Sequence, residues 1–216
     1  MKQLIIGLHG QRGVGKDTIA DQLCKAHGFT RLAFADQVKG DLCAMFGVPR
    51  QWFDDRKLKE QSEGLLAIHC CDDDQFRDWF AAQYDNDKVD AALAEPRSPR
   101  WLMQTYGTDY RRAQSNTYWV RRLIDKLTQV RGNVVVTDIR FNNEVSALVD
   151  YCECLTGTDL QLWQVLRTNN PHFIKGSHIS DQPVTYAFDR TILNGGTLNQ
   201  LLRKTSRTLT LAMRGE

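Results

Sequence analysis

The chain has no long apolar run, and it has only six cysteines among 216 residues. No stretch approaches the roughly 18 apolar residues that a membrane span needs, and the first residues lack the charged and then apolar layout of a signal peptide. The cysteines form no C-x-x-C pair, which argues against a zinc site and favours reduced thiols. We therefore expect a cytoplasmic protein that does not act at a membrane.

Neither sign of charge is in large excess, because the formal net charge is only +2. So small an excess argues against wide contact with a nucleic acid polymer, although basic residues can still gather around a phosphate. The length and the 42% hydrophobic content suit one globular α/β domain over residues 1–216.

The most informative stretch is the glycine-rich segment at residues 10–18, GQRGVGKDT. It follows an apolar run at residues 4–8 and precedes a helical pattern that starts at Ile19. A strand, a glycine-rich turn and a helix in this order form a phosphate-binding loop: backbone N–H groups and the helix dipole attract phosphate, and Lys16 adds a mobile charge. We expect it to bind a nucleoside triphosphate through Gly13, Val14, Gly15, Lys16, Asp17 and Thr18.

The loop departs from the usual pattern after its lysine. Asp17 stands where a serine or threonine is common, and the hydroxyl follows at Thr18. Hard oxygen ligands suit Mg²⁺, so Asp17 and Thr18 are the predicted metal ligands.

A second chemical feature follows the apolar run at residues 133–137, which predicts a buried parallel strand. Asp138 ends this strand and Arg140 lies two residues beyond it. The carboxyl ends of parallel strands border the nucleotide crevice, where a guanidinium donates two hydrogen bonds to phosphate. A salt bridge from Arg140 to Asp138 or Glu144 is the structural alternative.

The remaining patterns alternate between strand and helix. We expect strands at 29–33, 160–166 and 191–193, helices near 75–85, 119–130 and from 197 onward, and thus a parallel sheet with helices on both faces. Residues 50–95 have weak periodicity and read as a peripheral insertion, with the Asp72–Asp74 run solvated. Trp119 is expected in the core, although its ring could also stack on a nucleobase.

Taken together, the motifs resemble those of bacteriophage-type deoxynucleoside monophosphate kinases, within the P-loop nucleotide kinase group. The resemblance rests on the segments 15–18, 102–109, 118–120, 138–144, 178–181 and 192–198. It implies a P-loop nucleotide kinase fold in a single domain, with a variable insertion at about 50–95 and a lid-like loop at about 167–183.

The resemblance also implies a reaction: ATP, with Mg²⁺, phosphorylates a deoxynucleoside monophosphate to the diphosphate. Lys16 and Arg140 are the expected catalytic residues, and Arg167 the expected ATP contact from the lid. The expected acceptor-binding residues are Arg12, Arg100, Gln104, Gly107, Asp109, Arg111, Trp119, Asp138 and Arg140.

Two alternatives remain open from the sequence. One is a P-loop kinase of another small phosphorylated acceptor, and the other is a nucleotide-switched NTPase whose nucleophile is water. A hydrophobic surface on the insertion could also pair two subunits as a homodimer.

Overall fold

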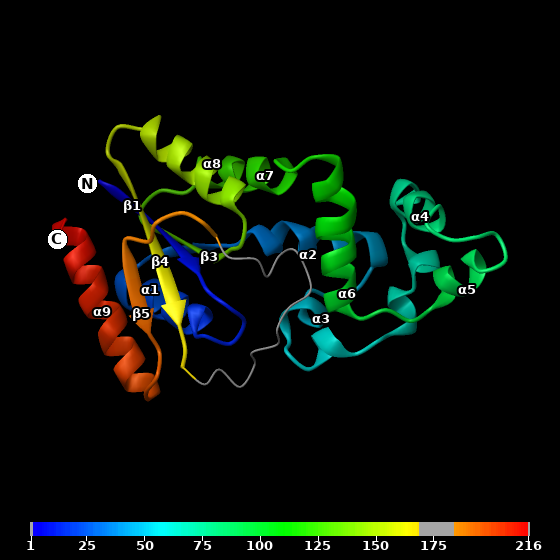
Figure 1. Cartoon of the computed structure of the whole chain (residues 1–216), viewed down its shortest axis with the longest axis horizontal. Coiled ribbons are helices and arrows are strands. Elements are labelled where there is room, and N and C mark those ends of the chain that lie inside the picture. The colour runs from blue at the N-terminus through cyan, green and yellow to red at the C-terminus, as the bar shows by residue number, and fades with distance from the viewer. Residues whose placement is uncertain (1, 169–183, 216) are drawn as a thin grey trace. The chain divides into compact units, whose positions relative to one another are not determined.

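The computed structural model describes residues 2–168 and 184–215, which divide into two compact units (Figure 1). Unit 1 contains the segments Met1–Phe34 and Val120–Glu216, and unit 2 is Ala35–Trp119. Unit 2 is therefore continuous in sequence, whereas unit 1 is built from two separated segments.

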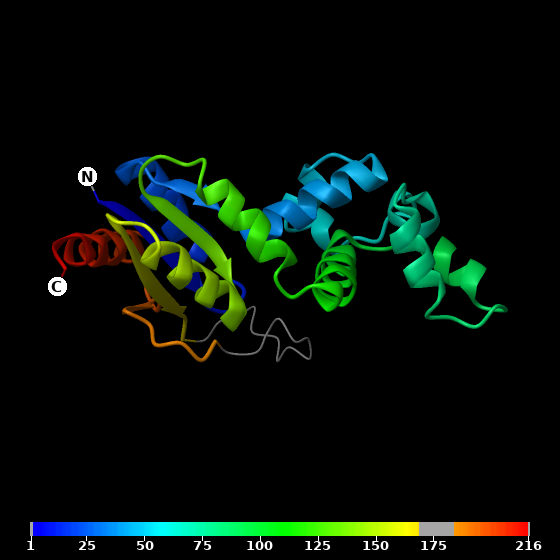
Figure 2. The same cartoon turned by 90° about the horizontal axis from the view of Figure 1, so that it is seen from above.

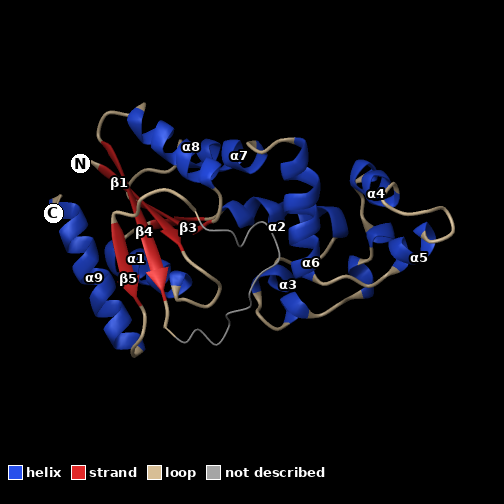
Figure 3. Ribbon diagram, in the orientation of Figure 1, coloured by secondary structure: helices blue, strands red, loops and turns tan. Residues whose placement is uncertain are grey.

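Unit 1 is built around a five-stranded sheet in the order β2-β3-β1-β4-β5, with every neighbouring pair parallel (Figure 3). This confirms the predicted α/β class with a parallel sheet. The strands are β1 (Gln3–His9), β2 (Thr30–Leu32), β3 (Val134–Ile139), β4 (Thr158–Leu166) and β5 (Arg190–Leu193).

Helices cover both faces of this sheet, as expected from the strand–helix alternation. On one face α1 (Lys16–His27) and α9 (Leu198–Arg214) bury their apolar stripes against one core cluster. On the other, α8 (Asn142–Glu153) contacts β4, and Figures 1 and 2 show it across the sheet from α9. The helix α7 (Tyr118–Leu127) starts in the last two residues of unit 2 and continues in unit 1.

The alternation of side chains along β1 explains this arrangement. Leu4, Ile6 and Leu8 belong to the core cluster under α1 and α9. Ile5, on the opposite face, is also fully buried. A strand that is apolar on both faces is typical of a parallel sheet covered on both sides.

The carboxyl ends of the parallel strands lie at one edge of the sheet, and the predicted site residues lie at or just after these ends. The glycine-rich loop follows β1, Asp138 and Arg140 lie at the end of β3, and Arg167 follows β4. Ligands of open α/β sheets bind outside this edge.

Unit 2 contains mostly short helices around an aromatic core. They are α2 (Phe34–Phe46), which begins at the last residue of the first segment of unit 1, α3 (Gln51–Asp54), α4 (Asp74–Ala81), α5 (Val89–Ala94), α6 (Pro99–Gln104) and a π-helix (Thr105–Arg112), with 3₁₀ turns at Leu58–Glu60, Gly64–Leu66 and Ile68–Cys70. Residues 50–95, expected to be a peripheral insertion, all lie in this unit.

Local capping explains two of these helix starts. Ser98 accepts a hydrogen bond from the Trp101 N–H, with Pro99 at the first helical position of α6. Asp73 accepts one from the Phe76 N–H and caps α4. The expectation that the aspartate run is solvated is therefore wrong for Asp73, whose side chain is only 18% exposed.

Candidate functional site

The glycine-rich loop turns sharply away from β1, and its geometry requires glycine. Gly10 has φ 147°, and a Cβ there would lie 2.3 Å from the Val165 carbonyl oxygen. Gly15 has φ 108° and forms the N-cap of α1 without a side-chain cap bond. The first N–H groups of an α-helix have no acceptor within the helix, so the start of α1 directly after this loop has the features of an anion-binding helix terminus.

Lys16 folds back over this loop. Its Nζ donates hydrogen bonds to the carbonyl oxygens of Gly10, at 2.5 Å, and Gln11, at 3.0 Å. Burial, and secondly repulsion from the Arg140 guanidinium, lower the pKa of Lys16 to about 8. Lys16 and Arg140 thus lie close enough to repel one another, and an anion between them would relieve that repulsion.

The end of β3 is held by backbone hydrogen bonds. The buried Glu144 accepts from the N–H groups of Arg140, at 2.8 Å, and Phe141, at 3.1 Å, so it fixes the turn from which the exposed Arg140 extends. Asp138 accepts from the Phe34 N–H at 2.8 Å.

The predicted metal ligands offer the right type of atom. Asp17 is exposed and forms an ion pair with Arg31, which also contacts Asp21 at 3.3 Å. Within the described ranges no three acidic, histidine or cysteine side chains form a group that could hold a metal ion. Mg²⁺ with a nucleotide needs fewer protein ligands, because phosphates and waters complete its shell. The oxygens of Asp17, Thr18 and Asp138 fit that chemistry.

Two side chains from neighbouring strand ends bind the loop carbonyls. Arg167, after β4, donates to the Gly13 carbonyl at 3.3 Å. Asn194, after β5, donates to the Val14 carbonyl at 2.8 Å. Arg167 was expected near ATP, whereas Asn194 was missed as a site residue. The Asn-Gly-Gly turn directly after a strand was the available signal.

His9 is a second residue that sequence reasoning missed. Its Nδ1 lies 3.0 Å from the Ile139 carbonyl, and its ring stacks on Phe188 at a centroid distance of 5.2 Å. Burial lowers the pKa of His9, and the charges of Lys16 and Arg140 lower it further. A neutral ring here adds no third positive charge at this edge.

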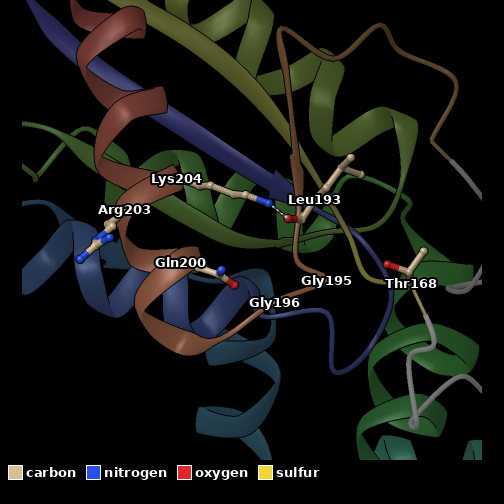
Figure 4. Close-up of a pocket in the computed structure, with 7 residues that line it drawn as sticks. All are labelled: Thr168, Leu193, Gly195, Gly196, Gln200, Arg203 and Lys204. Atoms are coloured by element: carbon tan, nitrogen blue, oxygen red, sulfur yellow. Dashed lines mark hydrogen bonds between the residues drawn. The ribbon is translucent and has the colours of Figure 1, made fainter.

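A cavity of about 510 Å³ lies beside the turn between β5 and α9 (Figure 4). It is lined by Thr168, Leu193, Gly195, Gly196, Gln200, Arg203 and Lys204. Lys204 donates a hydrogen bond to the Leu193 carbonyl at 2.7 Å. Asn194, which lies in sequence between the lining residues Leu193 and Gly195, donates a hydrogen bond to the Val14 carbonyl of the glycine-rich loop.

Several predicted acceptor residues lie in unit 2, on α6 and the π-helix. Arg100 forms an ion pair with Glu60 at 2.6 Å, Gln104 ends α6 and Asp109 is exposed on the π-helix. Arg12, by contrast, is exposed in the glycine-rich loop of unit 1.

Three other predicted acceptor residues belong to the interior of unit 2. The Arg111 guanidinium donates hydrogen bonds to the Asp73 carboxylate at 3.0 Å and to the Tyr106 hydroxyl at 2.9 Å. The Cζ atom of Arg111 lies 4.8 Å from the Tyr110 ring centroid. Trp119 is buried and donates its indole N–H to the carbonyl of the equally buried Gly107 at 2.7 Å. These contacts fix the π-helix to its surroundings. Most of the predicted lid, residues 169–183, lies outside the described residues.

Comparisons with known proteins address the activity. A family model described as deoxynucleotide monophosphate kinase matches residues 56–205, which is well over half of the chain. No curated protein matches the chain. A solved structure of an unliganded sugar kinase from Janibacter sp. HTCC2649 aligns over 98% of this chain and 96% of its own, at 11% identity and a TM-score of 0.40.

Proposed function

Because the chain belongs to the deoxynucleotide monophosphate kinase family and is a phosphotransferase, we propose that its donor is ATP, held with Mg²⁺ at the glycine-rich loop. The γ-phosphoryl group passes to the 5′-phosphate of a deoxynucleoside monophosphate, giving a deoxynucleoside diphosphate and ADP. The family match begins at residue 56, beyond the glycine-rich loop, and the geometry of unit 1 supports the donor site.

The observation that carries this proposal is the placement of Lys16 and Arg140 at one edge of the sheet: Lys16 begins α1 after the loop that follows β1, and Arg140 directly follows β3, the parallel neighbour of β1. Two cations held together in this way, next to the first turn of a helix, favour a highly charged anion. In the proposed complex Lys16 and the loop N–H groups bind the β- and γ-phosphates, and Arg140 neutralises the transferring group.

The acceptor chemistry explains why no general base is required. A phosphate monoester has its second pKa near ~6 and is mostly dianionic at neutral pH. The enzyme then needs to align two anions and neutralise charge. We assign acceptor binding to Arg100, Gln104 and Asp109, and a supporting role within unit 2 to Arg111 and Trp119.

The Mg²⁺ ion would be held by Asp17 and Thr18, with Asp138 as a further oxygen ligand. Bound there, it would neutralise phosphate charge during transfer. Asp17, on the first turn of α1, forms an ion pair with Arg31.

We further propose that the base and ribose of ATP occupy the cavity beside the turn between β5 and α9. Two of its lining residues, Leu193 and Gly195, flank Asn194, which bonds Val14 of the loop, and Gly195 and Gly196 add no side chains to the lining (Figure 4). Apolar surface from Leu193 and polar groups from Thr168 and Gln200 are the kinds of lining that a nucleoside requires.

We propose that this reaction takes place in the cytoplasm, where ATP and nucleotides are available. All six cysteines are free thiols, as reducing compartments favour. Across residues 2–168 and 184–215, no helix combines the length and apolar character of a bilayer span.

The decisive experiment measures ADP release from ATP with each deoxynucleoside and ribonucleoside monophosphate in turn. We expect release only when a deoxynucleoside monophosphate is present. Steady ADP and phosphate release without an acceptor would instead support the NTPase alternative. Full activity with a non-nucleotide phosphate ester, and none with nucleotides, would contradict the proposed acceptor.

A further inference from the structure

We infer that Asn194 is a positioning residue for the glycine-rich loop, because it orients the Val14–Gly15 peptide so that the Gly15 N–H faces bound phosphate. The inference rests on the proposed ATP site and assigns a function to a residue far from it in sequence. Val14 and Asn194 are 180 residues apart and meet at the carboxyl edge of the sheet.

The hydrogen bond sets the direction of one peptide plane. The Asn194 Nδ2 donates to the Val14 carbonyl oxygen at 2.8 Å. A trans peptide is planar, and its C=O and N–H point in opposite directions. With its carbonyl held toward Asn194, this peptide directs the Gly15 N–H away from Asn194, which is the side on which we place bound phosphate. Such N–H groups form the cradle for phosphate oxygens.

Gly15 and Asn194 depend on each other sterically. A Cβ on Gly15 would lie 2.7 Å from the Asn194 Nδ2 and 3.2 Å from a methyl carbon of Leu201. Gly15 also has φ 108°, where other residues are strained. The amide therefore occupies the space that a side chain at residue 15 would fill, and only glycine permits this contact.

Asn194 is itself held by the sheet. Its backbone N–H donates to the Leu166 carbonyl at 2.7 Å, directly beyond the paired residues Leu166 and Leu193 of β4 and β5. A donor attached to two paired strands is more rigid than one on a free loop, and a rigid support reduces the reorganisation needed on binding.

Asn194 acts through orientation because its amide carries no charge. Arg167 holds the preceding carbonyl, that of Gly13, at 3.3 Å, but its guanidinium would also attract phosphate directly. Removing Arg167 would change both the orientation and the charge, so Asn194 isolates the orienting effect.

The test compares Asn194→Ala with Asn133→Ala by isothermal titration at pH 7.5. Asn133 also bonds a backbone group, accepting from the Leu4 N–H at 2.9 Å, but it precedes β3 and lies at the opposite edge of the sheet. The ligands are inorganic tripolyphosphate, which has no base, and ATP. We expect Asn194→Ala to weaken both by about fivefold, as loss of one hydrogen bond predicts, and Asn133→Ala to change neither.

A second variant covers the case in which the alanine substitution prevents folding. Asn194→Asp keeps the shape of the side chain, but its carboxylate cannot donate to the Val14 carbonyl, and we expect it to weaken tripolyphosphate binding by more than fivefold because it also adds negative charge. A thermal midpoint of Asn194→Asp close to that of the wild type would show that this variant keeps the fold.

Two results would overturn the inference while leaving the ATP site intact. In the first, Asn194→Ala binds tripolyphosphate as tightly as the wild type does and loses affinity only for ATP, which would place Asn194 against the base or ribose. In the second, both ligands bind the variant normally. A wild type that binds neither ligand would overturn the ATP site, and the role of Asn194 with it.

Discussion

Affinity for ATP should fall as the pH rises through 8, because Lys16 must be protonated to bind phosphate. Burial and the neighbouring Arg140 lower the pKa of Lys16 to about 8 in the free protein, whereas its ordinary value is about 10.4. Bound phosphate would favour the charged amine and raise this pKa again.

The expected magnitude follows from these two protonation states. Well below pH 8 the amine is charged in both the free and the bound protein, so affinity should be flat there. At pH 9 about one free molecule in ten still carries the proton, so the Kd should be roughly tenfold higher than at pH 7, provided that the bound pKa is well above 9. Binding at pH 9 should then take up nearly one proton.

Isothermal titration at pH 7, 8 and 9 in buffers of different ionisation enthalpy measures both quantities. ATP contributes little, because its terminal phosphate titrates near ~6. The matched control is Lys16→Arg, whose guanidinium stays charged throughout, so its Kd should not change with pH. A wild-type Kd that is constant from pH 7 to 9, or one that rises equally in Lys16→Arg, would refute the reasoning.

Four further predictions concern named side chains. Arg140→Ala should lower kcat on the order of 10³-fold. Because it removes the repulsion between Arg140 and Lys16, it should also move the alkaline loss of ATP affinity to higher pH. Unchanged turnover in steady-state assays would exclude Arg140 from catalysis. Gly195→Val should fill part of the cavity and raise KM for ATP while leaving tripolyphosphate affinity unchanged in titrations, and equal losses for both ligands would contradict the base site. Arg100→Ala should raise KM for the monophosphate by about tenfold with little change for ATP, as loss of a charged contact predicts, and a selective effect on ATP would reverse this assignment. Arg111→Ala should lower the free energy of unfolding by about 2–3 kcal/mol, because the Asp73 carboxylate and the surrounding tyrosines lose their cation. A urea denaturation curve that matched the wild type would show that these contacts contribute nothing to stability.

Much of the sheet and one edge of the site could be predicted because the signals are local. The apolar run of β3 and the glycines before α1 each determine their own backbone, and parallel strands bring their ends to one edge. Asp138 and Arg140 were therefore expected beside the loop from strand order, whereas Arg167 was expected there only from the lid that the family resemblance implies.

The missed features depend on contacts between residues far apart in the chain. The Asn-Gly-Gly turn after β5 marks Asn194 as a residue at a strand end, but it does not indicate that Asn194 will donate to Val14. Likewise, no local pattern indicates that Asp73 will leave its solvated run to bind Arg111. The π-helix also escaped prediction, since its side-chain pattern continues that of α6 without a break. Arg111 looked like a phosphate ligand from its charge, and only the tertiary structure reveals three tyrosine rings around it.

The split of unit 1 into two segments has a consequence for synthesis on the ribosome. The central strand β1 is made first, but its partners β3 and β4 begin at Val134 and Thr158. At about 5–20 residues per second, its apolar residues must wait for several seconds or more before they can pair. Unit 2 is continuous and can complete its own contacts in that interval. During synthesis, unit 2 should therefore be folded while β1 is still unpaired and available for binding by chaperones.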